Sequence, residues 1–235
     1  MVRIPRLVPR LHNILGLVIG GQVLLWIASG FFFSLYPIEQ VRGEHLRAEP
    51  PGALVLQSDG LVSPANLPGV AGGTVSTVRL KPFLSGAAYE TDTAQGKALF
   101  DAMSGAPLSP LDEALARQVA EAGWAGKGVL SGLALVDPAP REAGRGHGRA
   151  MWRADFDGKD AATFWIDPQT GDVAAVRTGL WRTYDLLWGL HIMDWTNRET
   201  FTSWWMKLAG FLSLVLTLAG IWLVVERVRK GRILR

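Results

Sequence analysis

The chain has 235 residues, of which 49% are hydrophobic and none is cysteine. The absence of cysteine excludes thiolate catalysis, iron–sulfur clusters, cysteine metal sites and disulfide bonds. The net charge is +3, and because much of the excess lies near the two ends of the chain, it indicates membrane topology and gives no argument for nucleic-acid binding.

The first predicted element is a membrane-spanning helix over 14–36, a stretch without a charged residue. An apolar run of about 18 or more residues can cross the hydrocarbon core, where the backbone must bond within its own segment as an α-helix. The preceding Arg3, Arg6 and Arg10 also suit a signal peptide. However, the apolar run exceeds the roughly 7–15 residues of a signal peptide, and no Ala-x-Ala cleavage site follows. We therefore expect an uncleaved anchor.

Three strands are predicted after a polar linker over 37–51. The alternating segments 75–80, 88–91 and 97–100 have the composition of strands, and the last two are separated by a turn at 93–96.

A helix is predicted to follow the motif Ser109-Pro110-Leu111-Asp112. Serine can cap a helix, proline suits the first helical position, and Asp112 completes an S-x-x-D capping box. Gly123 is expected to end this helix.

A second set of strands is predicted at 129–136, 151–156, 163–166 and 173–177. The last two are joined by the tight turn 167–171, where proline fixes φ and glycine supplies a positive φ. The segment 137–149 is rich in Pro, Gly and Arg and is expected to form a mobile loop. The predicted fold class is α+β, with antiparallel strands plus a helix between two transmembrane helices.

An amphipathic aromatic helix and loop are predicted over 180–198. Its aromatic and apolar side chains share one face at helical spacing: Trp181, Tyr184, Leu187, Trp188, His191 and Trp195. This composition favours a helix on the outer membrane surface, and the alternative is a core helix of the outer domain. Tyr36, Trp204 and Trp205 are expected at the same membrane boundary.

The second membrane helix is predicted over 201–226, with a charge-free stretch at 208–225. It is followed by a basic tail, 227–235, just as a basic segment, 1–13, precedes the first helix. By the positive-inside rule both termini are cytoplasmic and the region between the helices is periplasmic, which indicates a bacterial inner membrane.

The turn Asp167-Pro168-Gln169-Thr170-Gly171, within the hairpin 164–173, resembles the hairpin of the PepSY domain. The clearer copy of that domain covers about 109–178, and about 74–104 resembles a degenerate copy without the proline; together they fill a PepSY-like periplasmic domain, 37–179. The segments around Leu11-His12 and Leu190-His191 resemble PepSY-associated transmembrane helices.

The resemblance implies a membrane protein of the PepSY family in a two-helix form. Larger, four-helix relatives resemble haem-containing ferric-siderophore reductases, which implies electron transfer, b-type haem and iron uptake. Other PepSY domains resemble protease inhibitors or regulatory sensors. No nucleotide-binding glycine motif is present, so a nicotinamide cofactor cannot supply electrons without a partner such as a flavin reductase subunit.

The candidate cofactor residues are His12 and His191, as axial ligands of haem iron, with Gly16 and Gly20 beside His12 on one helix face. The alternatives are headgroup contacts of both histidines and simple helix packing by the glycines. The two histidines are expected about 30 Å apart, on opposite membrane faces. A bis-histidine haem would therefore need a homodimer or a partner subunit.

The remaining polar residues predict no catalytic site. His45 and His147 are expected in solvent, and Asp155, Asp157 and Asp160 are interpreted as a solvated hairpin tip in preference to a cation site. No catalytic triad or metalloprotease motif appears.

Two functional hypotheses follow. The first is an electron-transfer membrane subunit with haem b at His12 and His191. The second is a non-enzymatic, membrane-anchored PepSY module that binds or regulates a periplasmic or envelope protein, for which strand edges could accept a partner.

Overall fold

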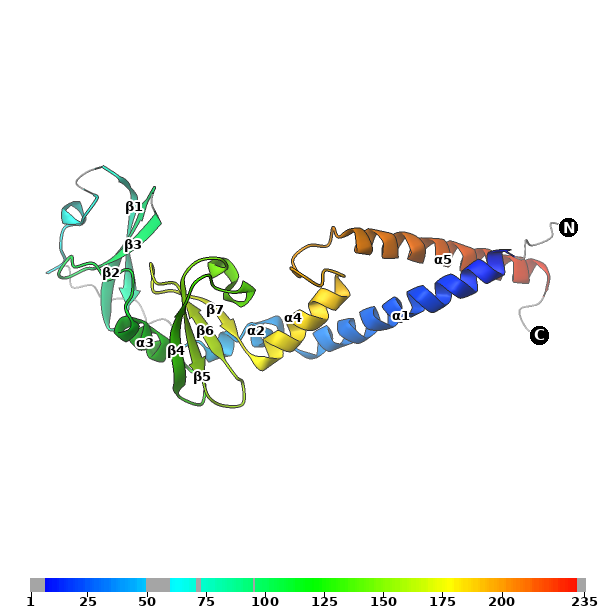
Figure 1. Cartoon of the computed structure of the whole chain (residues 1–235), viewed down its shortest axis with the longest axis horizontal. Helices are drawn as coiled ribbons and strands as arrows, with labels where there is room; N and C mark the ends of the chain where they lie inside the picture. The colour runs from blue at the N-terminus through cyan, green and yellow to red at the C-terminus, as the bar shows by residue number, and fades with distance from the viewer. Residues whose placement is uncertain (1–6, 50–59, 71–72, 95, 232–235) are drawn as a thin grey trace. The chain divides into compact units, whose positions relative to one another are not determined.

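The computed structural model describes residues 7–49, 60–70, 73–94 and 96–231 (Figure 1). Arg3, Arg6, Arg232, Arg235 and Gln95 of the sequence-based predictions lie outside these ranges. The chain forms two compact units, and each is described by itself. The helical unit comprises Met1–Pro37 and Thr183–Arg235, and the sheet unit comprises Ile38–Arg182.

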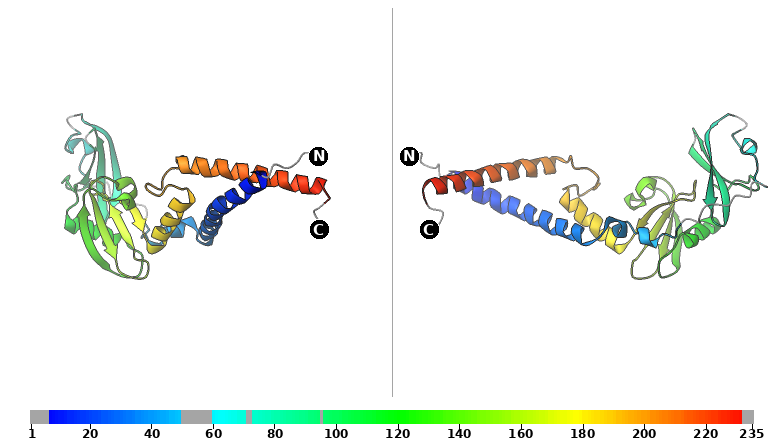
Figure 2. Two further views of the ribbon diagram at one scale, coloured as in Figure 1. Left: turned by 45° about the vertical axis from the view of Figure 1, so that its right-hand side comes forward. Right: turned by 180° about the vertical axis from the view of Figure 1, so that it is seen from behind.

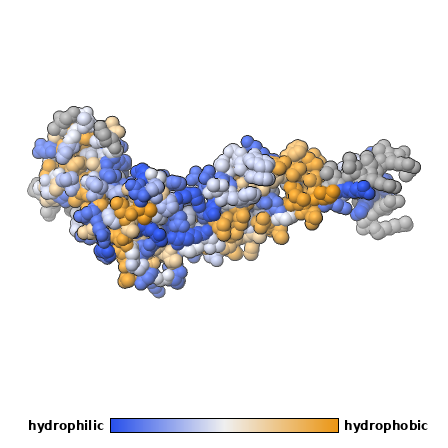
Figure 3. Space-filling view, in the orientation of Figure 1, coloured by the Kyte–Doolittle hydropathy of each residue, from blue (hydrophilic) through white to orange (hydrophobic). Residues whose placement is uncertain are grey.

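The helical unit contains α1 (Leu7–Leu35), most of α4 (Gly179–His191) and α5 (Trp204–Arg229). The segments His12–Leu35 and Trp204–Arg229 are long and apolar enough to cross a membrane, and only 11% and 6% of their most apolar windows are buried. Core helices of a soluble protein would be mostly buried. Figure 3 shows hydrophobic side chains gathered over this unit. The two predicted apolar helices are therefore present, as Leu7–Leu35 and Trp204–Arg229.

In the helical unit, α1 and α5 lie together near the two chain ends and diverge away from them (Figure 2). The buried or half-buried positions of α1 recur every three or four residues, as on the contact face of a packed helix. They include Ile19, Trp26, Ser29 and Phe33. The last turn of α4 occupies part of this face.

The first sheet of the sheet unit has the order β1 (Val75–Phe83), β2 (Gly86–Thr93), β3 (Gly96–Asp101), and all its pairs are antiparallel. The three predicted strands are thus confirmed, each somewhat longer than predicted.

The second sheet has the antiparallel order β4 (Leu130–Val136), β5 (Met151–Phe156), β6 (Thr163–Ile166), β7 (Val173–Arg177). Helix α3 (Glu113–Ala122) packs on one face of it. Between them Trp124 stacks on Phe156 with ring centroids 4.0 Å apart, and Phe164 meets both edge-on. The α+β fold with antiparallel sheets between two apolar helices is therefore as predicted.

Three local predictions differ from the structure. Asp112 caps α3 by accepting the Leu115 N–H at 2.8 Å, while Ser109 Oγ accepts the Leu99 N–H; the sequence made Ser109 the cap. The linker contains α2 (Ile38–Val41) and the 3₁₀ turn η1 (Glu44–Leu46), whose Leu46 joins the core.

The segment predicted as a mobile loop is the third difference. It contains the 3₁₀ segment η3 (Arg141–Gly146), and its Ala139 and Ala143 are buried against Met151 and Trp165. Small side chains allow this segment to pack closely on the sheet face opposite α3, which its Pro and Gly content did not indicate.

The predicted tight turn between β6 and β7 is present. Asp167 O accepts the Gly171 N–H at 2.8 Å, and Asp167 Oδ1 accepts the Gln169 N–H at 2.8 Å. Gly171 has a φ of +69°, which glycine adopts without strain. A Cβ at Gly171 would also lie 2.5 Å from the Phe83 ring of β1. The glycine therefore permits this turn to approach the first sheet.

The buried ammonium group of Lys81 joins the two sheets. Its Nζ donates to Glu90 Oε2 at 2.9 Å, Thr170 O at 2.8 Å and Asp172 Oδ1 at 2.9 Å, so its three hydrogens each have an acceptor. Lys97 Nζ binds the other Glu90 oxygen at 2.7 Å. A buried charge is tolerated when it is paired and fully hydrogen-bonded.

We expect Lys81→Met to destabilise the sheet unit by about 3 kcal/mol, because removing one member of a buried pair leaves the other's charge uncompensated. The loss falls at the low end of the usual range since Lys97 still pairs with Glu90. Urea unfolding of the full chain in detergent, followed by tryptophan fluorescence, measures it. Arg117→Gln, which removes the exposed pair with Glu113, is the control and should cost less than about 0.5 kcal/mol.

The stability of the sheet unit should also fall at acid pH, because Glu90 becomes protonated. Burial raises the pKa of Glu90, but hydrogen bonds and charges from Lys97 and Lys81 outweigh it, so the pKa is lowered. Such a carboxylate stabilises the folded state above its unfolded pKa of about 4.3, and that contribution is lost as pH falls through the folded pKa. The Tm difference between the wild type and Glu90→Gln should be constant near neutral pH and shrink below about pH 4. A difference independent of pH would contradict this account.

Candidate functional site

The candidate residues of the helical unit centre on His191, at the end of α4. The aromatic face predicted from the sequence is present, because Phe33 of α1 contacts Tyr184, Trp188 and His191 with ring centroids 4.4, 6.1 and 5.5 Å away. The ring of Trp188 is parallel to that of His191, 6.4 Å away. His191 therefore lies in an aromatic environment between α1 and α4.

Ser29 of α1 fixes the orientation of the His191 ring. Ser29 Oγ lies 2.7 Å from His191 Nδ1 and 2.6 Å from Leu25 O. A carbonyl oxygen only accepts, so when the single hydroxyl hydrogen is donated to Leu25, Nδ1 must donate its hydrogen to Ser29. We assign this tautomer, in which Nε2 carries the free electron pair. A metal-ligating histidine is commonly held through its other nitrogen in this way.

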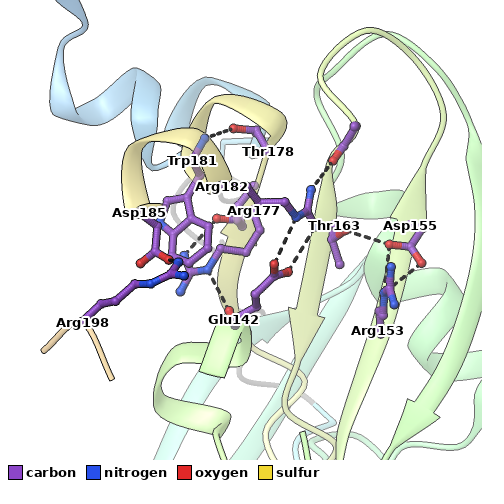
Figure 4. Close-up of polar contacts among 12 residues, drawn as sticks. Glu142, Arg153, Asp155, Thr163, Arg177, Thr178, Trp181, Arg182, Asp185 and Arg198 are labelled. Carbon is purple, nitrogen blue, oxygen red and sulfur yellow. Dashed lines mark hydrogen bonds and ion pairs between the residues drawn. The ribbon is translucent and has the colours of Figure 1, made fainter. Parts of the chain in front are cut away.

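Two further contacts hold α4, one at its end and one at its middle. Trp26 Nε1 donates to His191 O at 2.7 Å, and Arg198 binds Asp185 at 2.6 Å (Figure 4). The Arg198 side chain passes over Gly189, and a Cβ on Gly189 would lie 2.7 Å from Arg198 Cγ, so the glycine makes room for the arginine. Trp26 and Ser29 lie within the apolar span of α1, so the end of α4 contacts α1 inside that span.

His12 packs against α5. Its Cε1 lies 3.2 Å from the position that a Cβ on Gly220 would occupy, so the absence of a side chain there makes room for the ring. His12 Nδ1 is buried and has no hydrogen-bond partner among the described residues. Both residues line a cavity of about 600 Å³ that also contains Asn13, Arg227 and Lys230.

The predicted glycine groove beside His12 is open. A Cβ at Gly16 or Gly20 would meet nothing within 4 Å, so neither glycine makes a close contact in this chain. The histidine contacts Gly220 of α5, a residue that the sequence analysis did not select. His12 and Ser29 lie about 25 Å apart along α1 at 1.5 Å per residue, so the structure does not bring His12 and His191 together.

The two histidines differ in the partners of their ring nitrogens. His191 has a nitrogen with a free electron pair and aromatic neighbours, and His12 has an unpartnered buried nitrogen beside a cavity. Each site offers a single histidine. Among the described residues no group of three or more His, Asp and Glu could hold a metal ion.

The sheet unit holds a second polar cluster, on the sheet face opposite α3. Arg182 binds both carboxylate oxygens of Glu142 at 3.1 Å and also donates to Thr163 Oγ1 at 3.1 Å. Thr163 Oγ1 donates to Asp155 Oδ1 at 2.7 Å, and Arg153 Nε lies 3.0 Å from Asp155 Oδ2 (Figure 4).

The remaining predicted polar residues are accounted for individually. His45 and His147 are exposed. Asp155 belongs to the cluster just described, and Asp157 Oδ1 accepts the Val129 N–H at 2.6 Å. Asp155 and Asp157 therefore have structural partners, in addition to the solvent contact expected of them. Asp160 is half-buried, and its backbone O accepts the Gly179 N–H at 2.9 Å.

Trp26, Ser29 and Arg182 were not predicted from the sequence as site residues. A signal existed for the first two, because they share a helix face with Phe33 in an otherwise apolar helix, where polar groups usually bond to another helix. No signal existed for the pair of Arg182 and Glu142, since 40 residues separate them in sequence.

Comparison with known proteins gives a family. The family model described as the PepSY-associated TM region matches residues 10–235. No curated protein and no solved structure matched the chain. The match covers both apolar helices, α4 with His191 and the whole sheet unit, and the chain is therefore a membrane protein that belongs to the PepSY-associated TM region family.

Proposed function

We propose that this protein is a haem-binding, electron-transfer membrane subunit that acts as a homodimer or with a partner subunit. The observation that carries the proposal is the contact between Ser29 Oγ and His191 Nδ1, at 2.7 Å within the helical unit. It leaves His191 Nε2 as the nitrogen available to iron. Ser29 acts through His191 and is a positioning residue.

A b-type haem at this site would supply one-electron chemistry. Tyr184, Trp188 and Phe33 would exclude water from His191, and the Trp26 bond to the His191 carbonyl would hold the helix end in place. His12 is proposed as a second ligand position, because its buried Nδ1 has no partner among the described residues. Electrons would pass to an external acceptor such as a ferric chelate, consistent with a role in iron uptake.

A second protein copy or another subunit must complete any bis-histidine site. His12 and Ser29, the residue that contacts His191, are about 25 Å apart along α1, and the other histidines of the chain, His45 and His147, are exposed in the sheet unit. An electron donor is also required, and a membrane or flavin reductase subunit is the proposed class.

We further propose that the protein lies in a bacterial inner membrane with both termini cytoplasmic and the sheet unit periplasmic. The basic residues Arg227, Arg229 and Lys230 follow the second apolar helix, and such residues favour the cytoplasmic side.

The alternative is a membrane-anchored PepSY module that binds an envelope protein. One observation favours it: β4 is an edge strand of the second sheet and carries Leu135, which is 52% exposed, with Val129 67% exposed just before it. An exposed apolar strand edge can accept a partner strand. This role requires no haem, so a test for haem separates the two proposals.

Purified protein, expressed with haem supplied, should show a Soret band that shifts on reduction with dithionite. His191→Ala should abolish or strongly reduce the haem bound at that site. Ser29→Ala should weaken haem binding roughly 10-fold or more, because the His191 ring loses the hydrogen bond that orients it. The absorbance ratio of haem to protein and the reduced-minus-oxidised spectrum measure these effects.

His45→Ala and His147→Ala are the matched controls, because both histidines are exposed in the sheet unit; haem content should be unchanged. A colourless wild-type protein would exclude the haem proposal and leave the anchored module. Haem retained fully by both His191→Ala and His12→Ala would exclude these ligands.

The proposed orientation is tested by cysteine labelling, since the chain has no cysteine of its own. In spheroplasts, a membrane-impermeant maleimide should label Lys127→Cys, which is exposed in the sheet unit, and should label Arg229→Cys only after lysis. The reverse pattern would place the sheet unit in the cytoplasm.

A further inference from the structure

A cavity of about 530 Å³ lies on the face of the second sheet opposite α3, and no step of the proposed electron transfer uses it. Its walls come from η3, the strands β5 and β6, and Arg182 at the start of α4. Arg153 pairs with Trp165 and Asp155 pairs with Thr163 across β5 and β6, so these four side chains project from one face of the sheet.

The acidic and hydroxyl acceptors in this cavity are already engaged. Both Glu142 oxygens bind Arg182. Both Asp155 oxygens lie within 3.1 Å of Arg153 Nε, and Asp155 Oδ1 also accepts from Thr163. Thr163 in turn accepts from Arg182. The negative charge of each carboxylate in the cavity is therefore already paired with an arginine.

Two donors of residues that line the cavity have no acceptor among the described residues. Trp165 is 2% exposed and its Nε1–H has no partner among the described residues. Arg153 uses its Nε for Asp155, and no described residue binds its two Nη groups. A buried donor without an acceptor is unfavourable, and Trp165 and Arg153 are cross-strand neighbours.

From this pattern we infer that the cavity is a binding site for the carboxylate group of a small organic anion. The carboxylate would accept from the Nη groups of Arg153 and, after a small side-chain shift that opens the buried Trp165 indole N–H to the cavity, from that N–H as well, since it offers two oxygens and a negative charge. The Arg182–Glu142 pair forms a fixed wall of the site, and Pro140 and Ala162 offer apolar surface to the rest of the ligand. The cavity volume is within the usual range for small-molecule sites.

The experiment is an NMR titration of the full chain in detergent micelles, labelled with ¹⁵N at the tryptophan indoles, with sodium acetate as the probe. Trp165→Phe assigns the Trp165 indole signal. We expect this signal to shift in a saturable way with acetate and to stay in place with sodium chloride at the same ionic strength. Because a charge-assisted bond is lost, Arg153→Gln should weaken acetate binding roughly 10-fold or more.

Arg117→Gln is the matched control, because it removes an exposed arginine of α3 outside the cavity, and it should leave the titration unchanged. The dispersion of the other indole signals shows whether Arg153→Gln has folded. The inference is overturned if the Trp165 signal does not respond to acetate, or if Arg153→Gln binds acetate as tightly as the wild type. Haem content is measured on the same samples, so failure of this site is distinguishable from failure of the electron-transfer proposal.

Discussion

The sheet unit depends on one buried ammonium group. Lys81 Nζ reaches from β1 to Glu90 on β2 and to Thr170 and Asp172 in the turn between β6 and β7. The two sheets share no strand pair among the described residues, so side chains hold them together: this charge, the contact of Phe83 on Gly171, and a shared apolar core that includes Leu99 and Phe164. The turn therefore has a structural role: Gly171 makes room for Phe83, and the Thr170 carbonyl and the Asp172 carboxylate accept from Lys81.

The helical unit follows a different constraint, because polar groups inside a membrane must find partners within the protein. Trp26 and Ser29 meet this requirement by bonding the end of α4, and the same bonds orient His191. His12 Nδ1 has no such partner among the described residues. The ring of His191 is thus oriented through its Nδ1, whereas His12 lies beside a cavity between α1 and α5. This asymmetry is why the proposed function rests first on His191.

The two polar clusters serve different chemistry. In the helical unit a single histidine nitrogen is available among aromatic rings, which suits a cofactor with a large flat surface. In the sheet unit the acids are paired internally and the free groups are donors, which suits an anion. The net charge of the sheet-unit cavity does not reveal this preference, because Arg153 and Arg182 are balanced there by Asp155 and Glu142. The preference follows from which groups still lack hydrogen-bond partners.

The sequence by itself determined both membrane helices, the strands and the shared face of Tyr184, Trp188 and His191, because these depend on local periodicity and on the absence of charge. It misassigned the cap of α3 and the loop 137–149, since Asp112 and Ser109 are both good caps and a Gly-rich segment can still pack through small side chains. The tertiary structure alone decided the partners of the functional residues: Ser29 for His191, Gly220 for His12, Glu142 for Arg182. These pairs join segments far apart in the chain, and their geometry follows from how whole helices and sheets pack, which no local pattern encodes.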